Sequence, residues 1–103
     1  MRMRDRSWTV QELASETGGI VLGGQRILHQ LAGMATHDTR HLQSGGVFLA
    51  LLGANMHGLS LSQEAMQAGA VAVLCGSDAP PSMVREAHDQ LGDDVALITF
   101  AMP

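Results

Sequence analysis

Three short apolar runs, separated by two stretches with a helical pattern, constrain this sequence more than any other feature. The runs are residues 47–52, 70–74 and 95–100, and a glycine directly precedes each of the first two. Runs of this length with so few polar side chains predict strands that are buried on both faces of a sheet. Because a strand, a helix and a second strand in this order form a parallel pair, the sequence predicts a parallel sheet with right-handed crossovers.

The two segments between these runs are predicted to be helices. Residues 60–68 and 82–91 repeat apolar side chains at the spacing that places them on one helix face. We expect Ser60 or Ser62 to cap the first helix and Ser82 to cap the second, because a serine hydroxyl accepts a bond from a free amide of the first turn. A glycine follows each segment and is expected to end it.

The first third of the chain carries a different pattern. Thr9 and Glu12 are spaced as in a capping box, so a helix is predicted to begin there and to end at Gly18. Short extended stretches follow, with two glycines between the first two, which favours a hairpin or a tight bend. The expected extended segments are residues 20–22, 26–29 and 31–36.

These elements predict an α/β fold with a small mixed, mainly parallel sheet and flanking helices, in two or three layers. With 103 residues the chain has the length of one domain. We assign residues 8–103 to this domain and residues 1–7, which hold three of the six arginines, to a disordered or loosely held arm.

Composition excludes several classes of function. All six basic side chains are arginines, so the lysine of a nucleotide-binding P-loop and Schiff-base chemistry are both absent. The net charge of -4 and an aromatic content of 3% argue against nucleic-acid binding. A single cysteine, Cys75, permits neither an internal disulfide nor a thiolate zinc site. No apolar run approaches the roughly 20 residues of a membrane span, and we predict a soluble cytoplasmic domain.

Two polar segments are expected just beyond strand ends, where α/β sheets bind ligands. In the first, the Thr39 hydroxyl and the Arg40 guanidinium can hold a phosphate. The alternative for this segment is a simple turn in which Asp38 caps a backbone amide and Arg40 pairs with an acid. Residue chemistry alone favours that alternative.

The second segment is residues 53–58, in which Asn55 can bind a base edge or a sugar hydroxyl. Its glycines allow a ligand close to the backbone, although an ordinary loop between strand and helix has the same composition. His37 and His41 have a metal-ligand spacing only if they lie on a helix, and we expect a strand end and a loop there. We therefore predict no metal site, and no pair of catalytic residues is recognisable.

The order of these motifs resembles the N-terminal domain of the Mur ligases, which add the third and later residues to the peptidoglycan stem peptide. The resemblance covers about residues 8–100. Three positions depart from the family pattern: Ser44-Gly45-Gly46 replaces Pro-Gly-Asp, Leu52 replaces a polar residue, and His57 replaces a frequent Asp. The matching motifs are Asp38-Thr39-Arg40, Gly45-Gly46, residues 47–53, His57-Gly58 and residues 69–74.

The resemblance implies a domain that holds the UDP moiety of a UDP-N-acetylmuramoyl-peptide. It places Thr39 and Arg40 near the diphosphate or uridine. It places the second loop on the uracil side of the ligand. The loop residues expected to bind are Gly53, Ala54, Asn55, Met56, His57 and Gly58.

In the full-length family, ATP and Mg²⁺ bind to a central domain, and a C-terminal domain completes the ligase. This chain lacks the lysine of that ATP site, so we expect no cofactor and no ligase activity in the chain alone. Leu13-Ala14 followed by Gly18-Gly19 resembles the MurF type, which adds D-alanyl-D-alanine, whereas His57-Gly58 resembles some MurE-type ligases. The alternative function is an interaction module that has the same fold and binds no nucleotide.

Overall fold

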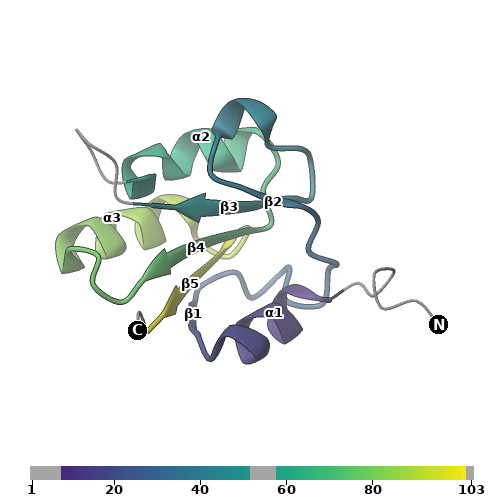
Figure 1. Cartoon of the computed structure of the whole chain (residues 1–103), viewed down its shortest axis with the longest axis horizontal. Helices are drawn as coiled ribbons and strands as arrows, with labels where there is room; N and C mark the ends of the chain where they lie inside the picture. Colours follow the sequence, from purple (N-terminus) through teal and green to yellow (C-terminus); the bar gives the residue numbers. More distant parts are fainter. Residues whose placement is uncertain (1–7, 52–57, 102–103) are drawn as a thin grey trace.

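The computed structural model describes residues 8–51 and 58–101, which form a five-stranded sheet with helices on both faces (Figure 1). The strand order is β1-β5-β4-β3-β2, and only β1 runs antiparallel to its neighbour. This arrangement confirms the mixed, mainly parallel sheet expected from the sequence. The strands are β1 (Ile20–Leu22), β2 (Ala35–Thr36), β3 (Val47–Ala50), β4 (Ala72–Gly76) and β5 (Ala96–Phe100).

The centre of the fold is the unit β3-α2-β4-α3-β5. Its strands are parallel and in close register, with Ala72 opposite Val47 on one side and Ala96 on the other. The connecting helices α2 (Ser62–Gln67) and α3 (Pro81–Leu91) both lie on one face of the sheet (Figure 1). Two successive right-handed crossovers that step in the same direction produce this placement.

Side chains of the central strands alternate between two hydrophobic cores. Phe48, Val73 and Leu97 belong to the core beneath α2 and α3. Leu74 and Ile98 belong to the second core, on the face that α1 (Val10–Thr17) covers. Because both faces are covered, the strands are apolar almost throughout, and the molecule has three layers.

Helix α1 begins as its sequence predicts. The Thr9 hydroxyl accepts a bond from the Glu12 amide at 3.1 Å, and the Glu12 carboxylate accepts from the Thr9 amide at 2.9 Å. Gly18, with φ +70°, ends the helix in the left-handed conformation that glycine adopts without strain. The capping box is therefore confirmed.

Residues 26–29 do not form the expected strand. They lie in a run of turns. Backbone carbonyls at the end of this run accept hydrogen bonds from the first amides of α1. Leu28 accepts from the Gln11 amide at 3.0 Å and Gln30 accepts from the Val10 amide at 2.9 Å. The first amides of a helix have no partner within it, and here they bind a neighbouring segment.

The expected serine caps are wrong. Helix α2 follows a 3₁₀ turn, η3 (Gly58–Leu61), and the Ser62 hydroxyl donates to the Leu59 carbonyl at 2.7 Å. Helix α3 begins at Pro81, whose ring presets the helical φ and removes one free amide. Of residues 31–36, only β2 is a strand, whereas Leu31 forms an isolated bridge with Thr9.

The expected N-terminal arm, residues 1–7, lies outside the described residues. Within the described part of the chain, no helix is both long and apolar enough to cross a membrane.

Candidate functional site

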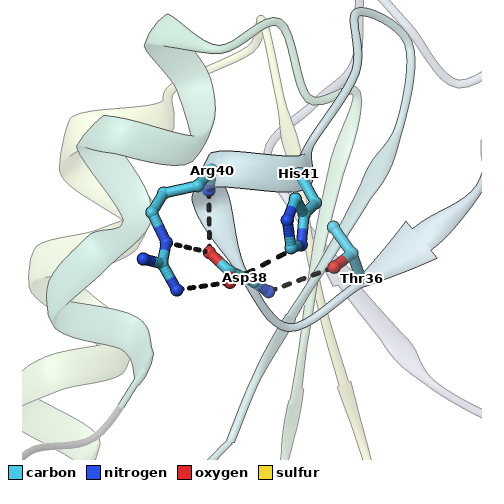
Figure 2. A network of polar contacts seen from close by, with 4 residues as sticks. All are labelled: Thr36, Asp38, Arg40 and His41. Atoms are coloured by element: carbon cyan, nitrogen blue, oxygen red, sulfur yellow. Dashed lines mark hydrogen bonds and ion pairs between the residues drawn. The ribbon is translucent and has the colours of Figure 1, made fainter.

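The first candidate segment follows β2 directly. Thr36 ends the strand, and its hydroxyl accepts a bond from the Asp38 amide at 3.1 Å. A single 3₁₀ turn, η2 (Thr39–His41), comes next, with Asp38 as its N-cap. Figure 2 shows the Arg40 and His41 side chains beside the Asp38 carboxylate, and the Thr36 hydroxyl at the Asp38 amide. The turn therefore depends on polar side chains rather than on apolar packing.

The Asp38 carboxylate holds Arg40 by three hydrogen bonds. Oδ1 accepts from the Arg40 amide at 2.9 Å and from Nε at 3.0 Å, and Oδ2 accepts from Nη2 at 2.9 Å. This is the turn that residue chemistry alone favoured, in which Asp38 caps an amide and pairs with the arginine. The guanidinium is nonetheless open to solvent, since 85% of the Arg40 side chain is exposed, against 23% for Asp38.

The pair shifts both ionisation equilibria in the direction of the charged forms. Hydrogen bonds from the Arg40 side chain and amide hold the pKa of Asp38 well below its usual range. The Asp38 carboxylate raises the pKa of Arg40. His41 adds a third group, with Nδ1 3.6 Å from Asp38 Oδ2. The turn thus presents an ion pair at the surface, in which each group favours the charged form of the other.

The second candidate segment leaves the end of β3. The Gly58 amide donates to the Leu51 carbonyl at 2.7 Å and closes the base of the loop. A side chain at Gly58 would place its Cβ 2.8 Å from the Leu51 amide nitrogen, so only glycine fits this closure. The other predicted residues of this loop, Gly53, Ala54, Asn55, Met56 and His57, lie outside the described residues.

The two segments leave the same edge of the sheet. β2 is parallel to β3, with Thr36 opposite Phe48, so η2 and Leu51 both lie beyond the carboxyl ends of adjacent strands. Of the predicted binding residues, the structure places Thr39, Arg40 and Gly58.

The turn before β3, in which Ser44 replaces the proline of the family pattern, is closed by backbone hydrogen bonds. The Gly46 amide donates to the Gln43 carbonyl at 2.8 Å, and Gly45 has φ +85°, as in a type II turn. The Gly45 amide also donates to the Gly69 carbonyl at 2.7 Å, which ties this turn to the end of α2. Backbone hydrogen bonds therefore hold this turn, because Ser44 lacks the ring that restricts φ in proline.

Two hollows accompany these elements. A pocket of about 180 Å³ lies beside η2 and is lined by Met34, Ala35, Thr36, His41 and Gln43. A larger groove of about 480 Å³ lies at the other side of the sheet, where β1, β5 and α3 meet. Sequence reasoning missed this groove, because its lining residues come from elements that are distant in the sequence. Residues that line it are Ile20, Leu22, Ser77, Val84, Arg85, His88 and Thr99.

The described residues contain no group of three or more His, Cys, Asp or Glu side chains that could hold a metal ion. Cys75 is buried in the sheet, and this burial, together with Asp78, raises the pKa of its thiol to about 11. It is therefore a packing residue rather than a nucleophile.

Comparison of the structure with solved proteins yields MurF from Acinetobacter baumannii. The match has a TM-score of 0.64 and 21% sequence identity, and it covers 93% of this chain. The fold is that of a Mur ligase N-terminal domain. This chain spans 18% of the length of that MurF chain. A scan against protein-family models and a search of curated proteins found no match.

Proposed function

We propose that this chain is the N-terminal substrate-binding domain of a peptidoglycan-precursor ligase and holds the UDP moiety of a UDP-N-acetylmuramoyl-peptide. Amide-bond formation would take place on ATP-binding and C-terminal ligase domains, which also supply the ATP and Mg²⁺ sites. With no lysine in its sequence, this chain is expected to show no turnover by itself in a coupled ATPase assay.

One observation carries the proposal. Within a Mur ligase-like fold, the Asp38-Thr39-Arg40 turn and the loop after Leu51 both leave the carboxyl ends of neighbouring parallel strands. Ligands of open α/β sheets bind beyond such ends. A guanidinium and a hydroxyl at this edge match the negative charge and the oxygen acceptors of a diphosphate.

The roles divide between the two segments. Thr39 donates its hydroxyl and Arg40 its outward N–H groups to the diphosphate. Gly53, Ala54, Asn55, Met56 and His57 form the uracil side, where the Asn55 amide can pair with the base. Gly58 closes the base of this loop through its bond to Leu51.

We further propose the MurF type rather than the MurE type. The preference rests on Leu13-Ala14 and Gly18-Gly19, which lie in and after α1, and on the Asp-Thr-Arg form of the first motif. His57-Gly58 is the feature that favours MurE.

Calorimetric titration of the chain with UDP tests the proposal. We expect saturable binding that the Thr39→Ala variant weakens by roughly fivefold, the effect of one hydrogen bond of about 1 kcal/mol. Ser82→Ala, an exposed hydroxyl at the start of α3, is the matched control and should leave the affinity unchanged.

Absence of UDP binding would refute the proposed function and leave the alternative, an interaction module with this fold. Binding that Thr39→Ala does not weaken would remove Thr39 from the site while the domain assignment stands.

A further inference from the structure

The Asp38 carboxylate lies between two potentially cationic side chains. It accepts the Nε–H and Nη2–H groups of Arg40, and His41 Nδ1 lies 3.6 Å from its Oδ2 (Figure 2). The same carboxylate caps η2 by accepting the Arg40 amide. Asp38 is in turn fixed by its own amide, which donates to the Thr36 hydroxyl at the end of β2. A chain of bonds therefore connects the sheet to the guanidinium.

This contact occupies one side of the guanidinium and leaves the other side available. An arginine has five N–H donors, and the Asp38 side chain engages two of them. No other partner of the Arg40 side chain occurs among residues 8–51 and 58–101. The remaining three donors belong to a side chain that is 85% exposed, so they face solvent in a fixed orientation.

An arginine at the surface normally samples many rotamers, and a ligand must immobilise it on binding. Here the Asp38 carboxylate already holds Arg40 in the unbound protein, through the backbone amide and through two N–H groups of the guanidinium. Such preorganisation strengthens binding even though the ordering group does not touch the ligand.

We propose that Asp38 is a positioning residue, which orients Arg40 so that its outer N–H groups bind the diphosphate of the ligand. The inference rests on the proposed function, since it specifies how the same site recognises an anion. Asp38 itself does not touch the ligand.

The sign of the effect makes the inference testable. Asp38 carries a negative charge close to the site of an anion, so its removal would tighten binding if simple repulsion were its main effect. A positioning role predicts the opposite result. Asp38→Asn is the suitable variant, because an asparagine oxygen still caps the Arg40 amide but cannot form the charged pair.

The experiment is a double-mutant cycle, in which UDP and uridine are titrated into the wild-type chain, Asp38→Asn, Arg40→Ala and the double variant. We expect Asp38→Asn to weaken UDP binding by roughly two- to tenfold, the effect of one side chain that must now be ordered on binding. In the Arg40→Ala background the same change should have no effect or tighten binding. Uridine, which lacks the diphosphate, should bind all four proteins equally.

Equal weakening by Asp38→Asn in both backgrounds would overturn the inference, because Asp38 would then act on the loop as a whole. Tighter binding of UDP by the single variant would overturn it as well. If wild-type protein binds neither UDP nor uridine, the proposed function fails and this inference fails with it. Binding of UDP that is insensitive to Asp38→Asn refutes the positioning role alone.

Discussion

The central strands and the turn at the rim of the sheet are stabilised in different ways. β3, β4 and β5 are four or five residues long, and apolar side chains cover both of their faces. β2 has two residues, and the η2 turn that follows is held by bonds from the side chains of Thr36 and Asp38. The contrast shows that the central strands depend on apolar packing, whereas the turn at the rim depends on a few polar contacts.

The largest expected effect is on the rate at which a thiol reagent reaches Cys75 in the central sheet. Cys75 is 1% exposed in β4, and burial raises the pKa of its thiol to about 11. We expect a thiol reagent at pH 8 to label the native protein at least about a thousandfold more slowly than the protein in denaturant, because labelling requires opening of the sheet. Labelling at similar rates in both conditions would show that the central sheet opens freely.

A cavity in the same core should cost the most stability. Leu97 in β5 is fully buried beneath α3, so Leu97→Ala should lower the free energy of unfolding by about 3 kcal/mol. The matched control is Leu31→Ala at a position with 61% exposure, which should change it by less than about 0.5 kcal/mol. Urea denaturation measures both variants, and equal losses would show that the cost of removing a leucine side chain does not depend on its burial.

Loss of the N-cap of α1 should lower the free energy of unfolding by an amount between those of the two leucine variants. Thr9→Ala removes one half of the capping box, and we expect a loss of about 1 kcal/mol in the free energy of unfolding. Ser15→Ala, an exposed change within α1, is the control and should be neutral or slightly stabilising. A neutral Thr9→Ala variant would mean that the bonds that the first amides of α1 donate to the Leu28 and Gln30 carbonyls suffice to start the helix.

The smallest effect is the acid response of the rim. Because Arg40 lowers the pKa of Asp38, the carboxylate stays ionised as the pH falls through about 4, where an ordinary aspartate is half protonated. The contribution of the pair to stability is thus present above that pH and is lost only in stronger acid. Carbon NMR of the Asp38 carboxyl should show little titration between pH 5 and 3. Arg40→Ala should move the titration upward, towards the ordinary value, although the amide of residue 40 still donates to the carboxylate.

The sequence predicted the central strands because short apolar runs bounded by glycines and helical segments are typical of strands buried on both faces. Residues 70–74 and 95–100 overlap β4 and β5, and both hydrogen bonds of the α1 capping box are present. The failures occur where tertiary contacts decide. Residues 26–29 have a strand-like composition. Their segment instead binds the free amides at the start of α1, which lie far from it in the sequence, so the local pattern cannot reveal this contact.

The location of the candidate turn was predictable, and so were the contacts of Asp38, because residue chemistry favoured a turn in which it caps an amide and pairs with Arg40. Residue types placed Asp38, Thr39 and Arg40 after a strand, and the structure puts them beyond β2 beside the end of β3. The large groove by Arg85 could not be predicted, because its lining comes from β1, β5 and α3 and requires the complete sheet order.

The two edge strands of the sheet affect how readily one molecule can pair with another at high concentration. One end is β1, with three residues, and the other is β2, with two. A second molecule that tried to extend the sheet would find only a few backbone groups to pair with at either margin. The shortness of both edge strands therefore disfavours extension of the sheet from one molecule to the next.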